Sequence, residues 1–246
     1  MNYSCLLLLF VPACLKAQTA RDIIEAADAH MRGESSQASI SIQTIRPAWR
    51  REMTVDTWVK GRDLSLILVR APAREKGIVF LKRKKEVWNW LPALERSIKL
   101  PPSMMSQSWM GTDFTNDDLV KEASIVTDYE HRFIGDTTLM NRICYQIELL
   151  PKPGAAVVWG RLIVCIDKKD LLELHTRFFD EDGQLVNTMI AEEIKEMDGR
   201  LIPTRLVMIP KDKPGQKTIM IYHSIRYNRP IPDAFFSTEQ MKKMKY

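Results

Sequence analysis

The sequence predicts an α+β protein built on one large, curved antiparallel sheet of about eleven strands. Apolar and polar residues alternate with a period of two through most of the chain. The alternating runs are joined by short turns rich in Gly, Asp, Pro or Lys rather than by crossover helices, which favours an antiparallel sheet over a parallel nucleotide-binding one. No repeat or linker divides residues 18–246, so we expect a single domain there.

Composition excludes several classes of protein. Of the 246 residues, 45% are hydrophobic and 27% are charged, which is ordinary for a globular domain and excludes disordered and fibrous chains. The formal net charge is only +5, and the basic residues are dispersed rather than striped. We therefore expect no nucleic-acid partner.

The N-terminal segment, residues 1–17, is typical of a secretory signal peptide. It has a short apolar run from Cys5 to Val11 and small residues at Ala13 and Ala17. The run is shorter than the roughly 20 residues that a spanning helix needs. We expect export to the periplasm; the alternative is a degenerate lipobox in which Cys14 is lipidated and anchors the chain to a membrane.

Three capping boxes predict three helices. They are Thr19 with Asp22, opening a helix that runs to about Met31 and stops at Gly33; Thr115 with Asp118, opening a helix over about Asn116–Glu122; and Ser237 with Gln240, opening a C-terminal helix whose apolar side is Met241 and Met244.

Between the helices we expect strands on both sides of an irregular insertion, residues 101–120. The strand-like runs are Ser39–Ile45, Met53–Lys60, Leu64–Val69, Gly77–Leu81, Glu86–Leu91, Glu95–Leu100, Tyr129–Ile134, Ile143–Leu149, Val157–Ile166, Leu171–Phe179, Leu185–Glu193 continued by Glu192–Met197, Leu201–Ile209 and Thr218–Tyr227.

Two cysteines remain outside the N-terminal segment. Alternation places Cys144 and Cys165 on one shared face of neighbouring strands. An oxidising compartment permits a disulfide between them. The alternative is two free thiols, if the strand register keeps the sulfur atoms apart.

Catalytic and metal-binding motifs are missing from the sequence. His30, His131, His175 and His223 lack the spacing of a zinc site, and the nucleophile-elbow, dinucleotide and P-loop motifs are absent. The acidic residues Asp113, Asp117 and Asp118 fail the EF-hand pattern and are interpreted as helix-capping groups. We expect no enzyme, no metal and no cofactor.

An unusual concentration of Met and aromatic residues marks the insertion. Irregular segments are normally polar surface loops, whereas Met and Trp recur on adaptable apolar binding surfaces. We expect these residues to form the lid of an apolar cavity walled by strand residues; the alternative is that the insertion plugs the sheet as ordinary core. The candidate residues are Val55, Leu66, Leu68, Phe80, Trp88 and Trp90 in the wall, and Met104, Met105, Trp109, Met110 and Phe114 in the lid.

The segment Ser108–Leu119, SWMGTDFTNDDL, resembles the SxMGxDFxxDDL-type signature of the LolA-like outer membrane lipoprotein-sorting family. Residues Val87–Pro92 and Pro232–Phe236 are also similar to that family. The resemblance implies an incomplete β-barrel closed by helices around an apolar cavity. It also implies a non-enzymatic periplasmic carrier of acylated lipoproteins or other lipids, with an inner-membrane transporter and an outer-membrane acceptor as partners. An arginine that latches the lid is implied as well, and Arg46 is one candidate.

A carrier of this kind answers a solvation problem. At about 0.8 kcal/mol per methylene, an acyl chain of about 16 carbons costs on the order of 12 kcal/mol in water.

A second hypothesis is a sensor or adaptor module of the same fold that binds a membrane transporter or envelope protein through basic turns such as Arg83–Lys85. A third, a lipid hydrolase, lacks any nucleophile–base pattern.

Overall fold

The computed structural model describes residues 18–120 and 124–244. They form one open, thirteen-stranded antiparallel sheet in the order β6-β5-β4-β3-β2-β1-β13-β12-β11-β10-β9-β8-β7. The strands are β1 Ser35–Arg46, β2 Trp49–Lys60, β3 Leu64–Ala71, β4 Val79–Arg83, β5 Glu86–Leu91, β6 Arg96–Lys99, β7 Tyr129–Leu139, β8 Arg142–Pro151, β9 Arg161–Asp167, β10 Glu173–Phe179, β11 Leu185–Met197, β12 Arg200–Pro210 and β13 Lys217–Tyr227. The helices are α1 Ala20–Arg32, α2 Asn116–Val120, α3 Ser124–Thr127 and α4 Thr238–Lys243, with 3₁₀ turns at Pro92–Leu94, Pro102–Met104, Trp109–Gly111 and Asp233–Phe235.

The predicted fold class is confirmed, and each of the thirteen strand-like runs overlaps one strand, so the summed count of about eleven was two too low. The expected signal peptide, Cys14 and residue Glu122 lie outside the described residues. The sheet is two meanders rather than one, joined where β1 pairs with β13. Its two edges, β6 and β7, are therefore neighbours in sequence, and the chain between them must pass from one edge to the other.

Helix α1 begins and ends where the sequence predicts. The Thr19 backbone N–H donates to Asp22 at 2.9 Å, and the Asp22 N–H donates to the Thr19 hydroxyl at 3.2 Å. Gly33 ends the helix with φ of +67°, and a Cβ there would lie 2.9 Å from Oδ1 of Asn228, so glycine is required by both conformation and space. The helix packs its buried stripe onto the inner core.

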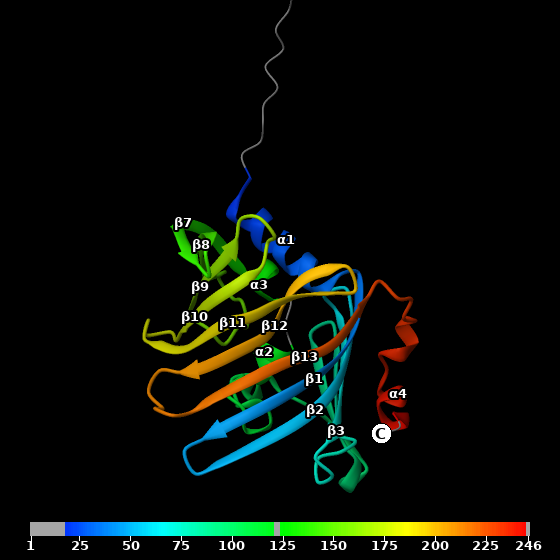
Figure 1. Ribbon diagram of the computed structural model, residues 1–246. Helices are drawn as coiled ribbons and strands as arrows, with labels where there is room; N and C mark the ends of the chain where they lie inside the picture. Colours follow the sequence, from blue (N-terminus) through cyan, green and yellow to red (C-terminus); the bar gives the residue numbers. More distant parts are fainter. Residues whose placement is uncertain (1–17, 121–123, 245–246) are drawn as a thin grey trace, which may run out of the picture.

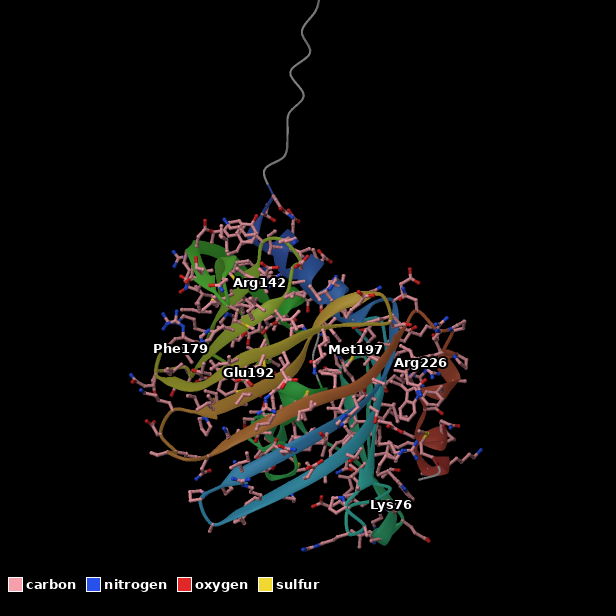
Figure 2. All side chains as sticks on the ribbon, viewed as in Figure 1. Lys76, Arg142, Phe179, Glu192, Met197 and Arg226 are labelled. Carbon is pink, nitrogen blue, oxygen red and sulfur yellow. The ribbon has the colours of Figure 1, made fainter. Side chains whose placement is uncertain are left out.

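Figure 1 shows how the helices and the curved sheet are arranged. Helix α1 lies at the upper end, α2 and α3 lie behind the strands within the curl, and α4 runs along the outside near β3. Figure 2 places Arg142 towards the α1 end and Lys76 at the opposite end, in the β3–β4 loop. Helices α1, α2 and α3 therefore cover the concave side of the sheet, while most of the convex side faces solvent.

The outer face of β2–β5 carries a second apolar cluster that α4 covers. Phe236 and Met241 are buried against Leu66 and Leu68, and Trp88 and Trp90 pack at the margin. The prediction that these four strand residues line the cavity is wrong, because they point away from it. Strand β3 is apolar on both sides, and its alternation sends Ile67 and Val69 inward instead.

The register of β5 explains why the side chains of its two tryptophans face outward. Trp88 lies opposite Leu81 and Trp90 opposite Val79, so both face the outer cluster and not the side of Phe80. The basic turn between these strands, residues 83–85, is exposed.

The cysteines share the outer face, and both thiols are free and buried. Cys144 lies opposite Asp167, whereas Cys165 lies opposite Gln146. The two cysteines are therefore diagonal neighbours, two residues out of register. Diagonal positions in an antiparallel pair are about 7–8 Å apart, beyond the Cα separation of ordinary disulfides, so the free-thiol alternative describes the structure.

Replacing Phe236 with Ala should lower the free energy of unfolding by about 3–5 kcal/mol, because the side chain is fully buried between α4 and β3. Urea denaturation followed by circular dichroism measures the change. Phe133→Ala is the control: that ring is 41% exposed on the edge strand β7, and its loss should cost much less. Equal effects of the two substitutions would contradict the packing of α4 described above.

Candidate functional site: an apolar cavity beneath the insertion

The concave face of the sheet encloses a cavity of about 290 Å³. This is near the lower end of the roughly 300–1,000 Å³ range of small-molecule pockets and far above the ~10–15 Å³ needed for one water. One wall is formed by β1–β3, including Ile40, Val55 and Ile67, and the facing wall by β9–β13, including Val164 and Met208. Helix α1 contributes Ile24, Ala27 and Met31 at one end. The lining is predominantly aliphatic.

The insertion supplies part of the lining. Of the expected lid residues, Trp109 and Phe114 are buried and line the cavity. Phe80 lies just behind Trp109, with ring centroids 5.4 Å apart. The expected wall residue Val55 also lines the cavity. These four aromatic and aliphatic residues are thus brought together on the concave side.

The methionines of the insertion are less deeply placed. Met105 and Met110 are half-buried and pack against the inner core, whereas Met104 is half-buried and belongs to no apolar cluster among the described residues. The carbonyl of Met104 instead accepts a hydrogen bond from Asn116 Nδ2 at 2.8 Å. This hydrogen bond connects two parts of the irregular insertion.

A buried ion pair anchors the insertion to the sheet. Arg46, at the end of β1, donates to both carboxylate oxygens of Asp113 at 2.9 and 3.0 Å and to the Gly111 carbonyl at 3.1 Å. On the other side of Asp113, the Thr218 hydroxyl of β13 donates to its carboxylate at 2.7 Å. Bidentate, charge-assisted geometry makes this contact strong and specific. Arg46, the candidate latch, thus contacts the insertion from the end of β1.

A second polar contact ties α2 to the β8–β9 loop. The Trp159 indole N–H donates to Oδ1 of Asp118 at 2.8 Å, and the Thr115 backbone N–H donates to Oδ2 at the same distance. The predicted capping box is confirmed, since the Asp118 N–H donates back to the Thr115 hydroxyl at 3.1 Å. The ring of Trp159 packs on Phe178 of β10, 5.1 Å between centroids.

Burial changes the acid–base properties of this contact. Removal from water raises the pKa of Asp118 from 3.8 to about 6, against the hydrogen bonds from Trp159 and Thr115, which lower it. Burial and the neighbouring carboxylates Asp117 and Asp118 likewise raise the pKa of Tyr129. The folded state binds the Asp118 proton more tightly than the unfolded chain does. This group therefore makes the free energy of unfolding fall as the pH rises from about 4 to about 6.

The facing wall holds a residue pair that sequence reasoning missed. Glu173 and Thr176 of β10 line the cavity, and the Thr176 hydroxyl donates to Glu173 Oε1. Burial raises the pKa of Glu173. In the sequence, Glu173 fits the alternation of polar and apolar residues in its strand and does not stand out. The register of β10 shifts after Glu173, and only this shift shows that the side chains of Glu173 and Thr176 both face inward.

The described residues carry two further negative findings. Nowhere in residues 18–120 and 124–244 do three His, Cys, Asp or Glu side chains gather as a metal site. Within the same ranges, no helix has the length and apolarity to cross a membrane.

Solved structures of other proteins share this architecture. A DUF1329 family protein from Desulfovibrio piger matches with a TM-score of 0.81 and 22% identity, over 90% of this chain and 97% of that one. A LolA superfamily protein from Nitrosomonas europaea matches with a TM-score of 0.79 and 23% identity, over 91% of this chain and 100% of that one. A putative outer membrane lipoprotein-sorting protein domain from Vibrio parahaemolyticus matches with a TM-score of 0.81 and 18% identity, over 91% and 98%. The chain thus has the LolA-superfamily fold.

Family membership follows from the sequence match. A family model whose description reads "Uncharacterized protein" matches residues 61–243, about three quarters of the chain, and the chain belongs to that family. No curated protein matches the chain.

Replacing Arg46 with Gln should loosen the insertion, because it leaves the carboxylate of Asp113 buried without its cation. Breaking one side of a buried pair costs about 3–5 kcal/mol. We expect faster amide hydrogen exchange across residues 109–114, measured by mass spectrometry. Lys195→Gln is the control, since Lys195 pairs with Glu193 on β11 and both side chains are exposed, 59% and 50%. Unchanged exchange in the Arg46 variant would show that the pair does not hold the insertion.

Replacing Trp159 with Phe should raise the pKa of Asp118 above about 6. In the wild type the indole N–H stabilises the charged carboxylate by a hydrogen bond, and phenylalanine cannot make this bond. Carboxyl carbon NMR across a pH titration measures it. Trp49→Phe, at the exposed first residue of β2, should leave the pKa of Asp118 unchanged. A lower pKa in Trp159→Phe would mean that the indole does not stabilise the ionised form.

Proposed function

We propose that this protein is a periplasmic carrier that holds an acylated ligand, a lipoprotein or another lipid, in the cavity beneath the insertion and passes it towards the outer membrane. The observation that carries the proposal is the aliphatic cavity of about 290 Å³ on the concave side of an open sheet. A closed barrel of this lining would trap its contents. An open sheet covered by a separately anchored segment allows a ligand to enter and leave.

The energetics favour an acyl chain as the occupant. Burying apolar surface stabilises a complex by about 25 cal/mol per Å². A wall of Ile, Leu, Val and Met residues from two facing groups of strands provides that surface on both sides of a chain. A polar ligand of the same size would lose its water without matching hydrogen bonds from such a wall.

The insertion is suited to act as the lid. It is attached to the sheet through Arg46 with Asp113 at one end and Asp118 with Trp159 at the other. Both attachments are polar contacts that break and re-form without covalent chemistry. A partner that binds the open arrangement more tightly would therefore release the ligand, and no catalytic residue is needed.

An unpaired donor in the lid supports a ligand that carries a carbonyl group. Trp109 is fully buried and lines the cavity, and its indole N–H has no hydrogen-bond partner within the part of the chain that the structure describes. A buried unsatisfied donor costs about 1–3 kcal/mol. The ester or amide carbonyl of an acyl group would offset that cost.

Two features support the finer points of this assignment. The N-terminal segment reads as an export signal, which supports a periplasmic location. The likeness in fold to a putative outer membrane lipoprotein-sorting domain supports acylated lipoproteins among the cargo.

A protein-binding adaptor of the same fold is the second candidate. The edge strand β7 and its neighbour β8 expose Phe133, Ile134 and Ile143, the last of them 61% exposed. An exposed apolar edge strand is a site where another chain can pair. Failure of all acyl binding in the following experiment would leave this candidate in place.

Replacing Val55 with Phe should lower the affinity for acyl ligands by tenfold or more, because Val55 is buried in the cavity wall and the larger ring would occupy the space of the chain. Displacement of a fluorescent acyl probe from protein purified without detergent measures the affinity, and native mass spectrometry of the same sample shows any lipid that co-purifies. Ile143→Phe adds a ring at an exposed position and should bind like the wild type. A wild-type protein with neither bound lipid nor probe affinity would refute the carrier role.

A further inference from the structure

A β-bulge places two polar side chains on the otherwise apolar inner wall. The pairing of β10 with β9 shifts register between Glu173 and His175. In a regular strand, residues three apart point to opposite faces, but here Glu173 and Thr176 both line the cavity and are hydrogen-bonded to each other. Bulges frequently re-aim side chains beside functional sites. The pair therefore forms a polar spot inside an apolar cavity.

The charges around the cavity are predominantly negative. Glu173 takes part in no ion pair within the described residues 18–120 and 124–244, and its carboxylate accepts a hydrogen bond from the Thr176 hydroxyl. The one arginine in the lining, Arg32, pairs with Asp28, which also pairs with Arg62, so the charge of Asp28 is compensated. The carboxyl groups of the lining are Asp28, Asp117, Asp118 and Glu173. An anionic group entering the cavity would meet this negative potential, whereas a cation would be attracted.

We propose that the polar end of the ligand is a protonated amine, which donates hydrogen bonds to the Glu173 carboxylate beside Thr176 while its apolar chain lies along the aliphatic wall. This inference rests on the proposed carrier function and names the class of ligand: an acyl or alkyl chain with an amino group, not a fatty-acid carboxylate or a phosphate.

The energetics of Glu173 agree with this assignment. A carboxylate in an apolar wall is unfavourable without a partner, and burial raises its pKa. An ammonium group at hydrogen-bond distance compensates the charge and favours ionisation. The indole N–H of Trp109, elsewhere in the lining, has no partner among residues 18–120 and 124–244 and would meet an acceptor on the ligand, which independently supports a ligand with polar groups.

The test compares three probes with the same twelve-carbon chain: dodecylamine and dodecanoate below their critical micelle concentrations, and dodecanol below its solubility limit. Isothermal titration calorimetry at pH 7.5 on the full chain measures their affinities. We expect the amine to bind at least tenfold more tightly than the carboxylate, with the alcohol between them. Glu173→Gln should lower the amine affinity about tenfold and change that of the alcohol little. Glu196→Gln, an exposed residue of β11, removes the same charge outside the cavity and should have no effect.

The outcomes separate the two proposals. If none of the three probes binds, the carrier function fails. If the alcohol binds but the carboxylate binds as tightly as the amine, or Glu173→Gln leaves the preference unchanged, the carrier function stands and the amine assignment is overturned. Thermal melting of each variant establishes that it is folded. The wild-type comparison of amine with carboxylate decides the assignment even if Glu173→Gln is unstable.

Discussion

The structure depends on one constraint: the concave face of an open sheet is apolar and must be kept from water without closing the sheet into a barrel. The two edge strands β6 and β7 are not paired with each other, so backbone hydrogen bonds do not close the curl. Instead, α1 and the insertion cover the concave face and pack side chains such as Trp109 against the inner core. This arrangement excludes water while leaving the covering elements separate from the sheet.

The attachments of the insertion differ from the packing of the rest of the molecule. The outer cluster under α4 is a dry apolar contact centred on fully buried residues such as Phe236. The insertion, by contrast, is held by buried polar contacts, Arg46 with Asp113 and Trp159 with Asp118. Polar contacts of this kind are directional, so a small displacement breaks them, whereas apolar packing weakens gradually. A segment attached in this way suits a two-state cover over a ligand.

The cavity combines an aliphatic lining with a small number of polar groups, as small-molecule sites generally do. In the proposed carrier, the apolar area would supply affinity for a chain regardless of its identity, and the polar groups would determine what else the ligand carries. Glu173 and Thr176 on one wall and the indole of Trp109 in the lid are the groups that would discriminate among ligands. The rest of the lining would accept any chain of fitting length.

Local patterns in the sequence determined the elements of this protein. Alternation located the strands, and the capping boxes at Thr19 and Thr115 and the N-cap Ser237 located the helix starts, because both depend on residues close in sequence. Tertiary structure decided which face of each strand is inner. Leu66 and Leu68 are as apolar as Ile67 and Val69, but α4, far along the chain, covers the first pair, while the concave side of the sheet buries the second. The partners of Arg46 and Glu173 were likewise decided by long-range register and by a bulge, which no local pattern encodes.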